Sequence, residues 1–137
     1  MEKQKLGWTD LSQSKELLKA GLDPNCADLY YKYDYNMHKH EDVVTQANKE
    51  DWQDPYNKDV PAWSLGALID IIPDSIKKGD VSFQFHSTFN IVDRFAACYE
   101  DSSYKRQIMC RAWNNPIELY VHIIVWLLEE GFIEKQK

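Results

Sequence analysis

Glycine and proline are scarce in this chain of 137 residues, which holds five of each. The glycines are scattered, and none of the patterns G-x-S-x-G, G-x-x-x-x-G-K-[ST] or G-x-G-x-x-G occurs. These patterns form the nucleophile turn of many hydrolases and the phosphate cradles of nucleotide-binding proteins. The sequence therefore contains no recognisable catalytic motif. We favour a protein that is not an enzyme, with no catalytic residues and no cofactor.

Cysteine and long apolar runs are also scarce. Cys26, Cys98 and Cys110 are an odd number without C-x-x-C spacing, which favours free, partly buried thiols. The longest apolar run, residues 119–128, is interrupted by His122 and is much shorter than the roughly 20 residues that span a bilayer. Residues 1–6 are polar and lack the apolar segment of a signal peptide. We therefore expect a cytoplasmic protein that is not associated with a membrane.

Positive charge is in the minority, with 16 basic against 22 acidic residues and a net charge of −6. The densest basic runs are the pairs Lys77-Lys78 and Lys105-Arg106. Contacts to nucleic-acid phosphates and to anionic lipid headgroups both need a clustered positive field. The charge pattern therefore argues against a partner that is duplex nucleic acid or a membrane surface.

Apolar and aromatic side chains are plentiful, at 44% and 13% of the chain. This composition excludes global disorder, and the length fits one domain over residues 1–137. Capped apolar stripes predict helices between Thr9 and Gly21, over residues 60–73 with Ser64 as a cap, and after Asn115-Pro116. A short helical turn is expected at residues 24–28, followed by an extended or irregular segment at residues 29–33.

Between the last two helices, the apolar pattern has a period of two residues, which is typical of half-buried strands. It predicts strands at residues 80–86, 94–99 and 104–111, with a polar turn at residues 100–103. The predicted fold class is α+β, with helices packed on one face of a small antiparallel sheet that is a three-stranded meander.

The segment of residues 34–59 has a different character. It contains seven acidic residues, three lysines and few apolar residues, so we interpret it as an acidic, aromatic, loop-like excursion. A turn or two of helix over residues 41–49 is one conformation it could contain, and Trp52 and Tyr56 could hold it against the body. Excursions of this length are usually functional or mobile loops.

Three blocks of sequence carry a family resemblance. They are QSKELLKAGLDPNCADLYY at residues 13–31, VPAWSLGALIDIIP at residues 60–73 and NPIELYVHIIVWLLEEGFI at residues 115–133. They resemble a family of small uncharacterised proteins from prophages and mobile elements of gut anaerobes. The resemblance covers roughly fifty positions and implies a cytoplasmic accessory protein of a mobile element. It implies no site residues.

Three groups of reactive side chains can each be interpreted in two ways. His38 and His40, with the acids that follow them, could hold a metal ion, but solvated loop residues are the favoured interpretation and no metal site is predicted. Glu118 and His122 stand four residues apart and could transfer a proton, although a polar helix edge is the simpler interpretation. Cys98 and Cys110 could form a nucleophile pair with His86, but cysteine on a strand is most often a small apolar residue.

Aromatic residues interleaved with acids provide the predicted binding surface. Rings anchor protein interfaces and acids attract a basic partner, so we predict a protein partner of unknown identity that contacts Tyr30, Tyr31, Tyr33, Tyr35, Trp52 and Tyr56. One alternative is that these rings only fold the segment onto the body. Another is a protein that binds or hydrolyses a signalling nucleotide, with basic side chains such as Arg94, Arg106 or Arg111 in its pocket. A homodimeric structural protein, joined through the apolar last helix, is a third.

Overall fold

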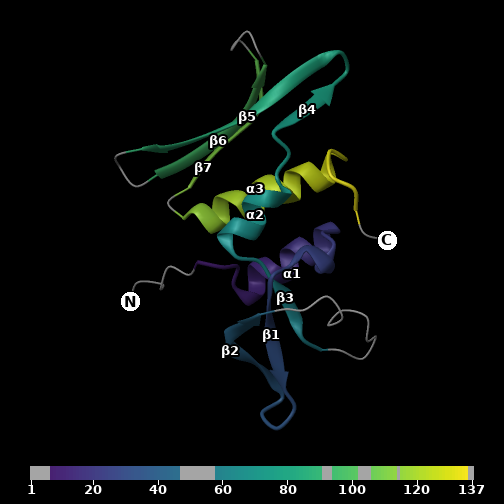
Figure 1. Ribbon diagram of the computed structural model, residues 1–137, viewed down its shortest axis with the longest axis vertical. Coiled ribbons are helices and arrows are strands. Elements are labelled where there is room, and N and C mark those ends of the chain that lie inside the picture. Colours follow the sequence, from purple (N-terminus) through teal and green to yellow (C-terminus); the bar gives the residue numbers. More distant parts are fainter. Residues whose placement is uncertain (1–6, 47–57, 91–93, 102–105, 114, 136–137) are drawn as a thin grey trace.

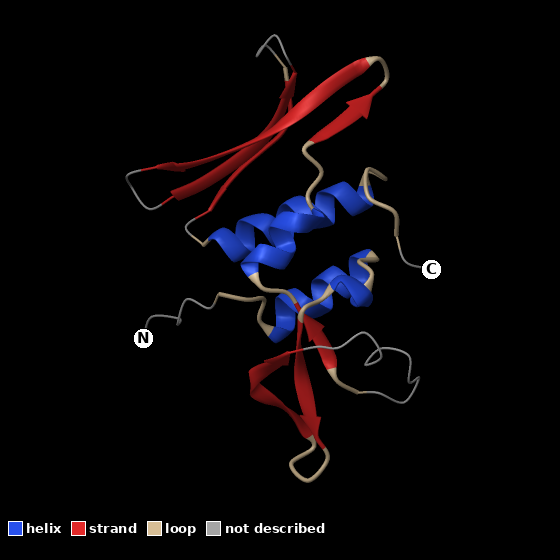
Figure 2. Ribbon diagram, viewed as in Figure 1, coloured by secondary structure: helices blue, strands red, loops and turns tan. Residues whose placement is uncertain are grey.

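The computed structural model describes residues 7–46, 58–90, 94–101, 106–113 and 115–135. These residues form two antiparallel sheets with helices between them, as Figure 1 and Figure 2 show. The α+β class predicted from the sequence is confirmed. Helix α3 (Pro116–Glu129) lies on one face of the larger sheet, as predicted, whereas the second sheet and the fourth strand of the larger one were not predicted.

The larger sheet contains β4 (Ser75–Lys78), β5 (Val81–Asn90), β6 (Arg94–Asp101) and β7 (Gln107–Trp113) in sequential order. The predicted meander is therefore extended at its start by β4. This strand was missed because it has only one buried residue, Ile76, and gives no alternating pattern. Gly79, whose φ of 64° suits a residue without Cβ, lies in the tight turn that joins β4 to β5.

The smaller sheet has the order β2-β1-β3, formed by β1 (Leu29–Asp34), β2 (Lys39–Gln46) and β3 (Val60–Ala62). The predicted loop-like character of residues 34–59 is thus wrong for residues 39–46, and the helix suggested over residues 41–49 is wrong for residues 41–46. The β-branched run Val43-Val44-Thr45 favours a strand, and β1 provides its partner. Residues 47–57 lie outside the described part of the chain.

The predicted helix over residues 60–73 is shorter than expected. α2 (Leu65–Ile71) begins after Ser64, whose hydroxyl accepts a hydrogen bond from the Ala67 amide at 3.2 Å. The preceding residues form strand β3 because all three of their side chains are buried against β1. Pro61 is tolerated there because β3 has a partner on one side only.

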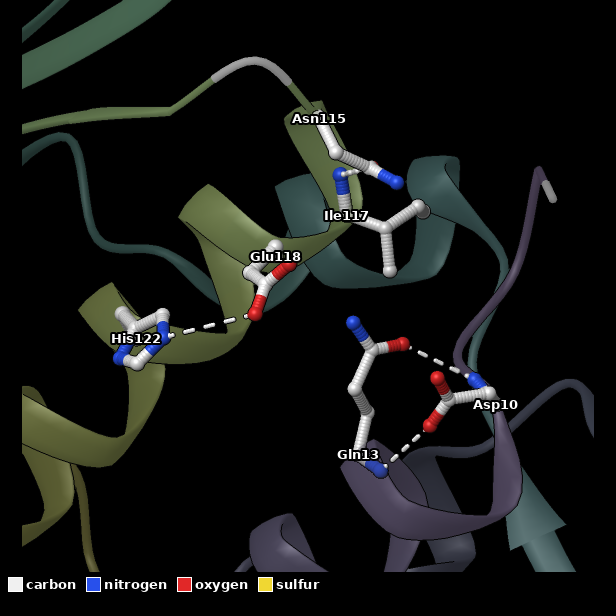
Figure 3. A network of polar contacts seen from close by, with 6 residues as sticks. All are labelled: Asp10, Gln13, Asn115, Ile117, Glu118 and His122. Carbon is white, nitrogen blue, oxygen red and sulfur yellow. Dashed lines mark hydrogen bonds and ion pairs between the residues drawn. The ribbon is translucent and has the colours of Figure 1, made fainter. Parts of the chain in front are cut away.

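Two helix starts are fixed by side-chain caps, shown in Figure 3. α1 (Leu11–Ala20) is capped by Asp10, which forms a reciprocal capping box with Gln13 at 2.7 and 2.9 Å. The predicted cap, Thr9, is instead buried. Its hydroxyl forms hydrogen bonds with the Ser14 hydroxyl and with the Trp63 backbone amide, which donates to it. In α3 (Pro116–Glu129) the predicted cap is confirmed, because Asn115 accepts from the Ile117 amide at 2.8 Å.

The helices pack between the sheets. α3 contacts β6 and β7 on one side and α1 and α2 on the other, and α1 also contacts β3. The main core joins α3 to the sheet residues Phe83, Ala97, Tyr99 and Met109. A smaller core of Tyr31, Val60 and Ala62 lies against α1, and Leu18 packs against both cores. Within the described ranges, no helix has the length and apolar character needed to cross a bilayer.

The apolar surface of α3 is covered within one chain. Seven of its residues are buried: Ile117, Leu119, Val121, Ile123, Ile124, Leu127 and Leu128. The homodimer alternative was based on this surface, and packing against the chain's own sheet and helices now accounts for it. Homodimer formation stays a prediction with no remaining observation in its favour. The helical turn predicted at residues 24–28 is present as the short 3₁₀ turn η1 (Pro24–Cys26), which is capped by Asp23.

Candidate functional site

The β1–β2 hairpin projects away from the helices, and its turn is the part of the described chain farthest along that direction (Figure 1). Asp34 organises the turn, because its carboxylate accepts hydrogen bonds from the amides of Asn36 and Met37 at 2.9 and 3.2 Å. His38 takes a left-handed conformation, with a φ of 53°, and allows the chain to reverse. The turn therefore has a defined backbone shape.

Four side chains gather beside this turn, and we name them the tip cluster: Tyr33, Tyr35, His40 and Lys58. The ring of Tyr33 packs edge to face against Tyr35 and His40, with centroids 5.0 and 5.1 Å away. The Lys58 ammonium lies 5.1 Å from the Tyr33 centroid and 5.8 Å from that of Tyr35. A contact between a cation and an aromatic ring contributes about 0.5–1 kcal/mol at an exposed site.

Hydrogen bonds between side chains and backbone connect the hairpin to the segment before β3. The Nε2–H of the His40 imidazole donates a hydrogen bond of 2.7 Å to the Lys58 carbonyl. The Tyr33 amide donates to the Asp59 carboxylate at 2.8 Å. These contacts hold residues 58–59 against the hairpin, so two separate segments of the chain meet at the tip cluster.

Exposure singles out the hairpin tip. Three large apolar side chains are exposed in the described part of the chain: Tyr35 at 60%, Met37 at 62% and Ile69 at 48%. Tyr35 and Met37 both belong to the turn, whereas Ile69 stands alone on α2. Neighbouring exposed apolar side chains on an ordered, projecting turn are typical of a protein-binding surface.

The predicted aromatic set is divided by the structure. Tyr31 is only 3% exposed and its hydroxyl donates to the Thr9 carbonyl at 2.8 Å, so it is a core residue that no partner reaches. Burial also raises the pKa of the Tyr31 hydroxyl. Tyr30 and Tyr33 are half-buried and Tyr35 is exposed. Trp52 and Tyr56 lie outside the described residues.

The acids of residues 34–59 have local roles where they are described. Asp34 and Asp59 accept backbone hydrogen bonds of the hairpin, and Glu41 and Asp42 lie on β2. Lys39 is paired with Asp34 in the β1–β2 ladder, and Lys58 lies over the rings of Tyr33 and Tyr35. The described tip therefore mixes both signs of charge, and it includes Met37, which the sequence-based prediction omitted. A methionine in a turn with an Asx pattern was the signal that could have identified it.

The groups considered for metal binding and proton transfer do not assemble into a site. Among the described residues, no three His, Cys, Asp or Glu side chains are placed to hold a metal ion. Glu118 lies 4.0 Å from the His122 imidazole (Figure 3), which itself stacks on Trp113 at 4.3 Å and 8°. Both side chains lie at the partly exposed edge of α3. The geometry therefore favours a polar helix edge over a site of proton transfer.

A shallow pocket of about 490 Å³ lies between η1 and α2. Asp28 and Asp70 contribute carboxylates to its lining, which contains no basic or aromatic side chain. The alternative of a nucleotide-binding protein predicted a pocket that contains aromatic side chains and at least two basic side chains. Arg106 and Arg111 instead lie exposed at β7, and the side chain of Arg94 is outside the described part. The two carboxylates of this pocket disfavour a phosphate.

Comparison with known proteins gives no relative for this chain: no family model, no curated protein and no solved structure matches it.

Proposed function

We propose that the protein binds a protein partner through the tip of the β1–β2 hairpin, with Tyr35 and Met37 as the anchoring side chains. The observation that carries this proposal is their joint exposure on one ordered turn. A tyrosine ring and a methionine side chain each bury a large apolar area when they enter a pocket, and both are common anchors of protein interfaces. The proposed role is binding without catalysis.

The tip cluster supports the proposal because it lowers the cost of binding. Lys58 and Tyr33 contact the Tyr35 ring. A side chain that is held before binding loses less rotational freedom on binding, which is worth about 0.5–1.5 kcal/mol for each immobilised side chain. We expect the complementary surface of the partner to be an apolar pocket that accepts Tyr35 and Met37 together.

Two wider parts of the proposal rest on the sequence alone. The resemblance of three sequence blocks is the reason to propose an accessory protein of a prophage or mobile element. Attraction of a basic partner depends largely on Glu50, Asp51 and Asp54, which lie outside the described residues. The contribution of these acids is tested by the salt dependence of binding, because long-range attraction weakens as ionic strength rises.

The test compares three full-length baits: the wild type, the double variant Tyr35→Ser/Met37→Ser, and the control variant Ile69→Ser. The protein captured by the wild type is identified, purified and titrated against each bait by calorimetry. We expect the double variant to bind at least about tenfold more weakly, because losing two anchors costs more than about 1.4 kcal/mol. The control removes an exposed apolar side chain of α2 and should bind like the wild type. Equal affinity of all three baits would refute the proposal.

A further inference from the structure

The outer face of the larger sheet brings two cysteines together. In strand β6, Ala97 and Tyr99 are buried against the helices, so Cys98 between them points to the opposite face. Cys98 is paired with Cys110 across the β6–β7 ladder, and with His86 across the β5–β6 ladder. Residues that are directly paired in a ladder share a face, so these three side chains form one row across the sheet.

The spacing of the ladder suits a bond between the two sulfurs. Directly opposed residues of an antiparallel pair have Cα atoms about 4.5 or 5.5 Å apart, and disulfides join Cα atoms about 4.4–6.8 Å apart. The pairs on both sides, Ala97 with Arg111 and Tyr99 with Met109, keep a regular register. No change of register or strand order is therefore needed to join Cys98 to Cys110.

The two thiols differ in how accessible they are to solvent. Cys110 is exposed and Cys98 is half-buried, and both are free. Ala96 and Ala112 form the adjacent pair on the same face, so small side chains border the thiols on that side. A small molecule can thus reach the Cys110 sulfur, with Cys98 beside it on the neighbouring strand.

We propose that Cys98 and Cys110 form a dithiol site that closes to an intramolecular disulfide by exchange with low-molecular-weight disulfides. The Cys110 thiolate attacks one sulfur of the small disulfide, a mixed disulfide forms and one small thiolate leaves. The Cys98 thiolate then attacks the Cys110 sulfur and expels the second small thiolate. Two protein thiols are oxidised, one small disulfide is reduced to two thiols, and the protons of the cysteines pass to those products through water.

The environment of Cys98 makes the closing step dependent on pH. Burial, then Glu100, then Cys110 raise the pKa of the Cys98 thiol. His86 lies opposite Cys98, with its imidazole 3.8 Å from the Glu100 carboxylate, and the Arg111 guanidinium of β7 donates to the Cys110 carbonyl at 2.9 Å. Because the thiolate is the attacking species, closure should accelerate as pH rises through the alkaline range.

The third cysteine is an internal control. Cys26 lies on η1, where its thiol donates to the Asp23 carbonyl at 2.9 Å and accepts from the Trp63 indole at 3.3 Å. It faces the pocket beside α2 and has no cysteine opposite it in a ladder. Burial raises the pKa of the Cys26 thiol and so disfavours the thiolate that attacks a disulfide. The proposal therefore predicts that Cys26 stays reduced while the other two cysteines pair.

The experiment treats the full-length protein with oxidised glutathione, and then counts thiols after denaturation and maps peptides without reduction. We expect the count to fall from three to one, with a linked pair of peptides that contain Cys98 and Cys110. The variant Cys26→Ser should form the same linked pair. The variant Cys98→Ser, checked for folding by its thermal transition, should accumulate a mixed disulfide with glutathione at Cys110.

Other outcomes would overturn the proposal. Glutathione adducts on all three cysteines without a linked pair would show that the sulfurs do not meet. Disulfide-linked dimers that disappear in Cys26→Ser would show that Cys26 is the reactive thiol. If Cys98→Ser does not fold, phenylarsine oxide, which bridges two close thiols, gives a second measurement on the wild type. Protection of Cys98 and Cys110 by this reagent supports the pair, and protection of neither contradicts it.

Discussion

The Tyr31 hydroxyl donates a hydrogen bond of 2.8 Å to the backbone carbonyl of Thr9, and both residues are buried. This contact fixes the base of the β1–β2 hairpin to the segment that leads into α1. Four positions later in the chain, Tyr35 is largely exposed at the opposite end of the hairpin. One short segment therefore carries a tyrosine that anchors the fold and another that is free to meet a partner.

The first prediction separates these two tyrosines by stability. Tyr31→Phe removes the hydroxyl and leaves the Thr9 carbonyl without this donor, so the free energy of unfolding should fall by about 1–2 kcal/mol. Tyr35→Phe should change it by less than about 0.5 kcal/mol, since that hydroxyl is at an exposed position. Urea denaturation of both variants measures the difference. Equal effects would contradict the assignment of Tyr31 to the core.

Tyr99 predicts how stability depends on pH. Its side chain is fully buried, its hydroxyl donates to the Pro73 carbonyl at 2.7 Å, and burial, followed by Asp74, raises its pKa. A raised folded-state pKa means that the full contribution of Tyr99 is present below the unfolded pKa of about 10 and is lost as pH rises further. We expect the unfolding free energy to decline above about pH 10, with a shallower decline in Tyr99→Phe. Denaturation at a series of alkaline pH values provides the measurement, and identical slopes would argue against this cause.

The cap of α3 gives a third prediction. Asn115→Ala removes the acceptor of the Ile117 amide and should lower the free energy of unfolding by about 1 kcal/mol. Asn115→Asp keeps an acceptor at the same place and is the matched control, with a much smaller loss. Thermal and urea transitions of the two variants would report the effect. A loss that is equal in both would show that the side-chain amide acts in some other way.

Local signals explain which parts of the fold could be predicted from the sequence. Asn115 and Pro116 mark the first residues of α3, and Gly131 lies two residues after its last residue, Glu129. Gly21 ends α1 with a φ of 107°. The smaller sheet could not be predicted in this way. It pairs residues 29–31 with residues 60–62, and nothing in either short segment specifies a partner so distant in the chain.

The candidate site was predicted in part. Aromatic composition drew attention to residues 30–35, which do form the hairpin with the exposed tip. The sequence could not show that Tyr31 is buried and Tyr35 exposed, because that depends on where β1 leaves the small core beside α1. The Asx pattern of the sequence could place Met37 in a turn, but its exposure beside Tyr35 depends on the folded structure.

Photo-crosslinking from the hairpin tip tests the central claim most directly. Benzoylphenylalanine replaces Met37 in one full-length protein and Gln84 in another, where Gln84 is an exposed residue of β5 in the opposite sheet. Irradiation in the cells that produce the protein should yield a covalent adduct with one partner protein from position 37 and none from position 84. An adduct from position 84 alone, or no adduct from position 37, would contradict a partner-binding role of the hairpin tip.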